Sequence, residues 1–268
     1  MMRLIFLSLM LASLFSLSLT GGFSPGHAAS RSGKLVRGGE ARVVSVVDGD
    51  TVVLDDKRQV RLVGIQAPKL PLGRDYVEKQ PFADQSKSGL EALLLGKVVR
   101  LSYGGRRLDR HGRALAHLHL KDGTWVQGWL LERGLARVYS FRDNRTRVDA
   151  MLALEGVARQ GQEGLWSHKF YRIISAARSH KLVDTFQLVK ARIKDAVRIK
   201  GRVYLNFGAD WRKDFTVTIS PKNGRLFKKA GLRPETWSGR EIRVRGWINW
   251  RNGPMIEATH PEQIEVLN

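Results

Sequence analysis

The sequence predicts a mainly β protein with added helices (α+β), built as tandem OB-fold barrels. The first half contains five short segments rich in β-branched or alternating apolar residues, with one amphipathic helix between them. Five more segments of the same kind follow after residue 184, separated by Gly, Asn and Asp signals. Five strands with an inserted helix is the count of an OB barrel. The length of 268 residues is sufficient for two such domains.

The first 29 residues have the pattern of a secretory signal peptide. Arg3 lies in a short positive start, an apolar stretch covers residues 4–19, and small residues precede Ala28 and Ala29. We therefore expect an exported protein, periplasmic or secreted, with no stable membrane insertion after the signal is removed. A retained anchor is the alternative, but three serines and an early Gly-Gly pair leave a short apolar run. The chain has no cysteine, which excludes disulfides, zinc-thiolate sites and a lipid anchor on cysteine.

Both halves of the chain are cationic. The whole chain carries 46 basic and 25 acidic residues, a net charge of +21. Residues 1–166 hold 25 basic and 16 acidic residues, and the remainder holds 21 and 9, so the halves carry +9 and +12. Such a charge favours a polyanionic partner, nucleic acid first and an anionic cell envelope second. Solubility alone is the simpler alternative.

The elements expected in the first domain, residues 38–168, follow from local pattern. An amphipathic helix begins at Pro81 and ends before Gly96, and Leu165-Trp166 closes the unit. The other expected elements are three strands between residues 40 and 65, strands at 98–103 and 114–120, and helices at 125–133 and 148–158.

Two carboxylates share one tight corner near the start of this domain. Asp48-Gly49-Asp50-Thr51 lies between two β-branched runs and predicts a hairpin turn in which Gly49 supplies an unusual backbone angle. The Arg61 side chain projects from the next expected strand. Arg113 follows a charged turn and stands directly before an apolar run. Such a set could converge on one phosphodiester. The alternative is that Asp48 merely caps its own turn.

Four motifs in this order carry a resemblance to a known family. They are Asp-Gly-Asp-Thr at 48–51, Val-Arg-Leu-Val-Gly-Ile-x-Ala-Pro at 60–68, Asp-Arg-His-Gly-Arg-Ala-Leu-Ala at 109–116 and Gly-Leu-Trp at 164–166. They resemble the staphylococcal nuclease (thermonuclease) family over about residues 38–168. The resemblance implies a five-stranded barrel with packed helices that hydrolyses nucleic acid. It also implies a calcium ion held partly by Asp50, and two arginines, Arg61 and Arg113, that grip the scissile phosphate.

The sequence departs from the family pattern at the catalytic centre. The family's second metal-binding aspartate falls on Gln66, the next position is Ala67, and the glutamate that activates water falls on Lys69. Calcium prefers six to eight oxygen ligands, mostly carboxylate. An ammonium group repels a divalent cation, and it is a poor general base unless burial lowers its pKa. Metal binding by Asp50 and Gln66 is thereby placed in doubt.

Three readings of these departures stay open. Lys69 replaces calcium as a fixed cation against phosphate, which leaves nucleic-acid binding with little hydrolysis. Alternatively, the insert at residues 70–80 folds back and supplies the carboxylates of Asp75 and Glu78. In the third reading both substitutions are neutral changes around a residual enzyme. The lysine favours the first reading, in which the protein binds DNA or RNA through Arg61, Arg113 and Lys69. An active calcium-dependent nuclease and a non-enzymatic envelope interaction module remain the alternatives.

Other residues near the expected groove match the family's nucleotide pocket. Arg110 and His111 match positions beside that pocket, and Tyr139 lies near a pocket tyrosine. Stacking of a base on an aromatic ring contributes about 1 to 3 kcal/mol. Ordinary packing is the alternative for Tyr139.

The second domain is expected at residues 184–268, after a linker or short helix at 169–183. Two loop tips in it combine aromatic and basic residues, Trp211-Arg212 and Trp250-Arg251, which suits single-stranded nucleic acid. The alternative is that both tryptophans cover the barrel ends. The expected elements are strands at 186–197, 201–207, 215–220, 241–249 and 255–259, and a short basic helix at 224–230.

Overall fold

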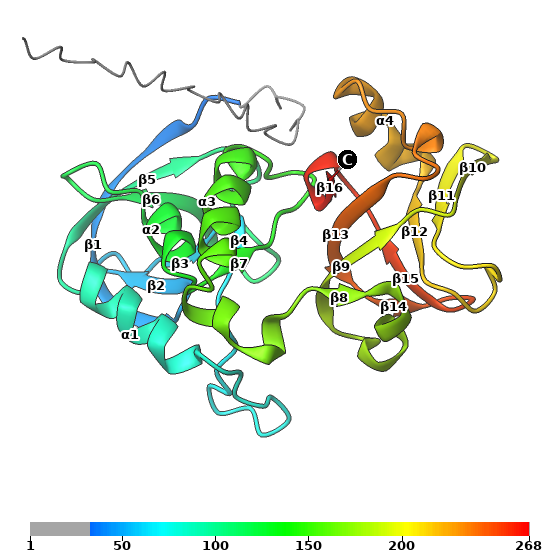
Figure 1. Ribbon diagram of the computed structural model, residues 1–268. Helices are drawn as coiled ribbons and strands as arrows, with labels where there is room; N and C mark the ends of the chain where they lie inside the picture. The colour runs from blue at the N-terminus through cyan, green and yellow to red at the C-terminus, as the bar shows by residue number, and fades with distance from the viewer. Residues whose placement is uncertain (1–32, 268) are drawn as a thin grey trace, which may run out of the picture.

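The computed structural model describes residues 33–267 (Figure 1). The predicted signal peptide at residues 1–29 therefore lies outside the described residues. Within the described residues, no helix is both long enough and apolar enough to cross a bilayer.

The first domain is built around a closed five-stranded barrel, as the sequence predicts. The strands pair in the order β1-β2-β3-β6-β5, antiparallel except between β3 and β6. Their bounds are β1 (Val36–Asp48), β2 (Thr51–Leu54), β3 (Gln59–Leu62), β5 (Val98–Tyr103) and β6 (Ala114–His119). Alternate side chains of these strands fill the interior, and Val43, Leu62 and Leu101 are fully buried.

Three helices pack on the barrel close to their predicted positions: α1 (Ala83–Leu94), α2 (Val126–Glu132) and α3 (Val148–Gln160). Helix α1 buries Ala83, Ser86, Leu90 and Leu94, the spacing of one helix face. It begins two residues later than expected because Phe82, at its N-cap, has a left-handed φ of 66°. The 3-10 turn η1 (Gly164–Ser167) buries Leu165 and Trp166 at the end of the domain.

A two-stranded sheet outside the barrel joins distant parts of the first domain. Strands β4 (Ile65–Gln66) and β7 (Arg137–Val138) pair antiparallel, with Gln66 opposite Arg137. Two-residue strands carry no periodic signal, and the sequence did not predict them. Their pairing places an arginine beside the Gln66 amide.

The segment expected as a linker or short helix contacts both domains. It contains η2 (Lys169–Tyr171), β8 (Ile174–Ser175) and η3 (Ala176–Leu182). Strand β8 pairs parallel with β9 of the second domain, and the buried Tyr171 hydroxyl donates to the Pro81 carbonyl at 2.8 Å. The segment is therefore tied down at both ends.

The second domain forms two sheets around one apolar core. The five-stranded sheet has the order β10-β11-β12-β15-β14, and the four-stranded sheet has the order β16-β13-β9-β8. Helix α4 (Pro221–Lys229) matches the predicted basic helix, and η4 (Pro234–Thr236) and η5 (Pro261–Gln263) are 3-10 turns. The strands are β9 (Phe186–Arg192), β10 (Asp195–Ile199), β11 (Arg202–Asn206), β12 (Thr216–Ile219), β13 (Glu241–Trp247), β14 (Asn249–Trp250), β15 (Pro254–Glu257) and β16 (Ile264–Val266). Two sheets replace the single closed barrel expected here, so the OB-type interpretation of this domain stays a prediction.

The expected strand at 186–197 is two strands, which corrects the prediction. The break falls at Ile193, which is buried and donates its backbone N–H to the Arg240 carbonyl at 2.8 Å. The next residue, Lys194, donates to the Asn206 carbonyl at 2.8 Å. The chain thus leaves one sheet and enters the other between β9 and β10.

The two domains meet across a buried charged interface. Figure 1 shows β13 and β16 of the second domain on the side that faces α3. Arg245 of β13 lies 2.9 Å from Glu155 of α3 and 2.8 Å from Glu265 of β16, and the Arg245 side chain is 1% exposed. A second pair joins Arg145 to Glu262 at 2.7 Å, and Ser140 Oγ lies 2.7 Å from His260 Nε2.

Candidate functional site

The acidic corner connects β1 to β2 as the sequence predicts. The Asp50 backbone N–H donates to Asp48 Oδ1 at 3.0 Å, so Asp48 does cap the turn. The role expected for Gly49 was wrong, because its φ is not in the left-handed region. Glycine is needed here for space: a Cβ would lie 2.2 Å from Ser86 Oγ and 2.7 Å from the Ala67 Cβ.

The Asp50 carboxylate is buried and its oxygens are engaged by the protein. Oδ2 accepts from the Ala67 backbone N–H at 2.6 Å and pairs with Arg61 at 3.1 Å, while Thr51 Oγ1 donates to Oδ1 at 3.3 Å. Burial raises the pKa of Asp50 to about 7; Arg61 opposes this shift and Asp48 adds to it. Arg61 therefore offsets part, but not all, of the cost of burying the Asp50 carboxylate charge.

The Gln66 side chain is held by an arginine. Its Oε1 accepts from Arg137 Nη2 at 3.0 Å and Nε at 3.3 Å. Because the guanidinium is a cation, the oxygen at the second expected metal position faces positive charge. Lys69 is exposed, and its Nζ lies 5.3 Å from the ring centroid of Trp247 in the second domain.

The residues present do not fit a calcium ion. Calcium needs several free oxygen ligands, but those of Asp50 and Gln66 are engaged by Arg61, Ala67 and Arg137. The insert at 70–80 covers a hollow of about 180 Å³ above Asp48 and Asp50 with Leu70, Arg74 and Val77. Asp75 and Glu78 are exposed and do not line it. In the described range no three Asp, Glu, His or Cys side chains cluster as metal ligands would.

Arg61 and Arg113 line one hollow of about 450 Å³, although they are 52 residues apart in the chain. Arg61 lies on β3, and its guanidinium donates to the Leu62 carbonyl at 2.8 Å. Arg113 is oriented by Asp109, whose Oδ2 accepts from Nε at 2.7 Å. Hydrogen bonding lowers the pKa of Asp109 against the effect of its partial burial. Two guanidinium groups thus face one hollow, as the sequence predicts.

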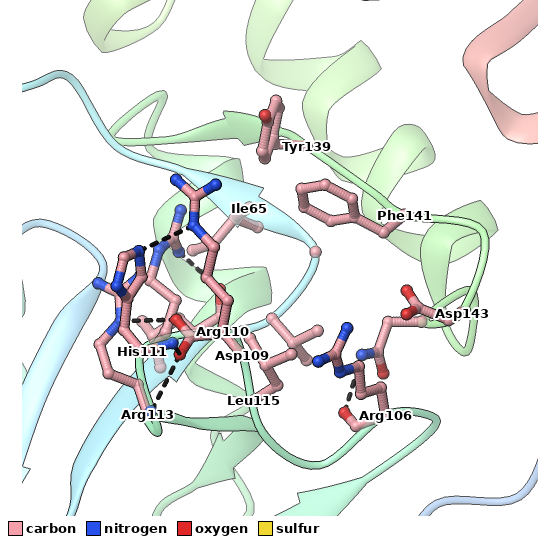
Figure 2. Close-up of a pocket in the computed structure, with 15 residues that line it drawn as sticks. Ile65, Arg106, Asp109, Arg110, His111, Arg113, Leu115, Tyr139, Phe141 and Asp143 are labelled. Carbon is pink, nitrogen blue, oxygen red and sulfur yellow. Dashed lines mark hydrogen bonds and ion pairs between the residues drawn. The ribbon is translucent and has the colours of Figure 1, made fainter. Parts of the chain in front are cut away.

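The other predicted residues of the first domain line the same hollow. Figure 2 shows Tyr139 and Phe141 along one side and the turn bearing Arg110, His111 and Arg113 along another. Arg110 Nε donates to His111 Nε2 at 3.0 Å, and both side chains are exposed. Phe141 was not predicted; its ring packs edge-on against Tyr139 at 5.0 Å. The alternation Tyr139-Ser140-Phe141 places both rings on one face and could have indicated it.

The residues predicted in the second domain divide between two places. Trp211 and Arg251 line a separate hollow of about 390 Å³, and the guanidinium of Arg212 lies 4.4 Å from the Trp211 ring. Trp250 lies outside this hollow, with its ring 5.9 Å from that of His180. Trp211 is 50% exposed and Trp250 is 61% exposed, so neither closes the core of the domain.

One second-domain residue that the sequence did not indicate reaches the first domain. Trp247 Nε1 donates to the Tyr139 hydroxyl at 2.9 Å, and the same ring faces Lys69. No local sequence pattern indicates this contact, because it depends on how the two domains dock.

The fold and the site together define a small closed barrel that presents two arginines to one hollow with aromatic walls. Comparison with known proteins agrees: the family described as "Staphylococcal nuclease homologue" (SNase) matches residues 59–168. The chain belongs to this family. It is 36% identical over 130 residues to an "Uncharacterized endonuclease" of Escherichia coli O157:H7, covering 47% of this chain and 76% of the relative. It is 27% identical to the thermonuclease of Staphylococcus hyicus, covering 47% and 75%, and 34% identical to endonuclease YncB of Bacillus subtilis strain 168, covering 47% and 60%.

Proposed function

We propose that this protein binds nucleic acid through phosphate contacts at Arg61, Arg113 and Lys69, with little or no hydrolysis. One observation carries the proposal: two arginines share a hollow, while the oxygens expected to hold calcium are engaged by cations and backbone. Lys69 lies on the rim of the adjoining hollow that contains Asp50. An ammonium there adds attraction for phosphate without a metal.

The walls of the hollow support binding to a nucleotide unit. The rings of Tyr139 and Phe141 offer a surface on which a base can stack, and Arg110 and His111 line another side of the hollow. Trp211, Arg212, Trp250 and Arg251 are exposed in the second domain and give it a separate surface of the same chemical kind. We further propose export, on the pattern of residues 1–29, and a partner that is DNA or RNA outside the cytoplasm.

Salt-dependent binding to a labelled oligonucleotide tests the proposal. A twelve-nucleotide thymidine strand, followed by fluorescence anisotropy, is expected to bind the mature chain and to weaken steeply as salt rises. Arg113→Ala should weaken binding about tenfold or more, since a hydrogen bond to a charged group contributes about 1.5 to 3 kcal/mol. The salt slope should fall by about 0.7, the value for one phosphate contact on a single strand.

The control is Arg133→Ala, which removes an arginine whose side chain is 49% exposed and lies outside the hollow. Equal affinity of the Arg113→Ala and Arg133→Ala variants would refute the phosphate site. Salt-insensitive binding would favour the envelope module. Cleavage of the strand by the unmodified chain in calcium, abolished by chelator, would favour the active nuclease.

A further inference from the structure

Another hollow, of about 410 Å³, lies between the two domains and is strongly basic. Its cations come from three parts of the chain: Lys69 after β4, Arg137 on β7, and Lys169, Arg172 and Arg178 on the connecting segment. Asp184 is the one carboxylate among the residues that line it. Five cations against one anion make this a surface that attracts negative charge.

Arg137 is the buried member of this set, and in the described part of the chain its guanidinium makes no hydrogen bond to a carboxylate. Its residue is 8% exposed, and its guanidinium donates to the Gln66 amide oxygen and to the Phe186 carbonyl at 3.2 Å. Within the described residues it forms no ion pair. Burial lowers the pKa of Arg137 to about 10; Tyr171 and Glu155 oppose this shift and Arg245 adds to it. A buried cation held only by neutral acceptors is costly, and an anion in the hollow would compensate for it.

This hollow adjoins the site already described. It shares Gln66 and Lys69 with the hollow over Asp50, and that hollow shares Arg61 with the one lined by Arg113. Cations therefore border all three hollows in sequence. A strand with evenly spaced phosphates is the polyanion that could contact each of them in turn.

Aromatic rings accompany the cations in the interdomain hollow. Trp247 is 38% exposed and Phe170 is 47% exposed, and both line it. Trp247 is held in place by the Tyr139 hydroxyl and by the Lys69 ammonium. Rings beside a basic groove suit unpaired bases, which stack on them, whereas the carboxylate side chains of an acidic peptide have no ring to stack.

We propose that the interdomain hollow binds the continuation of a single-stranded nucleic acid whose first phosphate lies between Arg61 and Arg113. Arg137, Arg172 and Arg178 contact its backbone, and Trp247 and Phe170 face its bases. The second domain thereby completes the binding track instead of acting as a separate module. This inference rests on the proposed function, because it extends the same strand.

Length-dependent binding separates the two claims. Thymidine strands of two, four, eight and twelve nucleotides are titrated into the mature chain, the Arg172→Ala/Arg178→Ala double variant and Arg113→Ala. The two arginines of the double variant are exposed and, in the described part of the chain, their side chains make no hydrogen bond, so folding should be retained. A matched control, Arg225→Ala/Arg240→Ala, removes two exposed arginines that do not line the hollow.

The double variant should bind the dinucleotide normally but bind the twelve-nucleotide strand at least about tenfold more weakly than the control does. Its salt slope on the long strand should fall by about 1.4, the value for two phosphate contacts. Arg113→Ala should weaken both strands. If the double variant matches the control at every length, the strand does not enter the hollow, and an acidic peptide becomes the better ligand. If Arg113→Ala has no effect while the double variant does, the first site fails and the interdomain site stands alone.

Discussion

Replacing Arg245 should reveal how strongly the two domains depend on one another. The guanidinium lies in the interface, 1% exposed, and bonds Glu155 Oε2 at 2.9 Å, Glu155 Oε1 at 3.0 Å and Glu265 Oε1 at 2.8 Å. Attraction to Glu155 and Glu265 outweighs desolvation and raises the pKa of Arg245. The perturbation we choose is Arg245→Met, which keeps much of the side-chain volume and removes the charge.

The size of the expected loss in unfolding free energy follows from the contacts that Glu155 and Glu265 keep after Arg245→Met. Breaking a buried ion pair by removing one partner costs about 3 to 5 kcal/mol. Here each carboxylate retains another cation, because Arg159 lies 2.9 Å from Glu155 and Arg243 lies 2.7 Å from Glu265. Glu155 Oε2 also keeps the Val138 N–H at 2.6 Å. We therefore expect a loss near the lower limit, about 3 kcal/mol.

Urea unfolding followed by tryptophan fluorescence and by far-ultraviolet circular dichroism measures this loss. The Arg245→Met/Glu155→Gln double variant should recover part of the free energy of unfolding, since a neutral amide then replaces a buried carboxylate that has lost the Arg245 cation. The control, Arg240→Met, alters an exposed arginine and should change stability by less than about 0.5 kcal/mol. A loss below about 1 kcal/mol for Arg245→Met would refute the role given to this ion pair.

Three further predictions follow from other contacts. The Gln66→Asp/Lys69→Glu double variant should not cleave nucleic acid in calcium, because Arg137 would pair with the new carboxylate at position 66. The triple variant that also carries Arg137→Gln should cleave it. Cleavage by the double variant would contradict this account. Burial lowers the pKa of His260 to about 4 from 6.5, so its contribution to stability is present above pH 6.5 and is lost as the pH falls toward 4. Between pH 7.5 and 4.5 the unfolding free energy should fall by about 2 to 3 kcal/mol more in the unmodified chain than in His260→Gln, and equal slopes would exclude His260 as the source. Gly134→Ala should destabilise by about 3 kcal/mol or more, because φ is 57° and the new Cβ would lie 2.1 Å from the Glu163 carbonyl oxygen. Gly123→Ala, with φ of 91° but nothing within 4 Å, should cost only about 1 kcal/mol, and similar losses by thermal denaturation for both would show that crowding at Gly134 is unimportant.

Local pattern was sufficient to predict the five barrel strands and the three helices of the first domain. Its strands and helices follow from alternation and from helical spacing, which act over a few residues. The closeness of Arg61 and Arg113 could be predicted because each follows a recognisable turn in a family motif. The parallel pairing of β3 with β6 is what joins them, with Arg61 opposite Leu115.

Contacts set by long-range pairing could not be predicted in the same way. Gln66 and Arg137 are 71 residues apart, and Glu155 and Arg245 are 90 apart. No local signal records such pairs, since they depend on strand register and on domain docking. The same reason explains the break at Ile193 and the contact of Trp247 with Tyr139. The substitutions at Gln66 and Lys69 were visible in the sequence, but the arginine that accounts for the first of them was not.

Strand β13 carries Arg245 and Trp247 two positions apart, and alternation in a strand directs both side chains to the same face. Arg245 joins the two domains through its ion pairs, and Trp247 forms part of the wall of the interdomain hollow. Any movement of the second domain that takes the Trp247 indole out of the interdomain hollow would also have to separate the Arg245 guanidinium from Glu155 and Glu265. Cutting the chain after residue 168 would expose the Glu155 carboxylate face that now meets Arg245, so the N-terminal half should be less stable alone than within the whole chain.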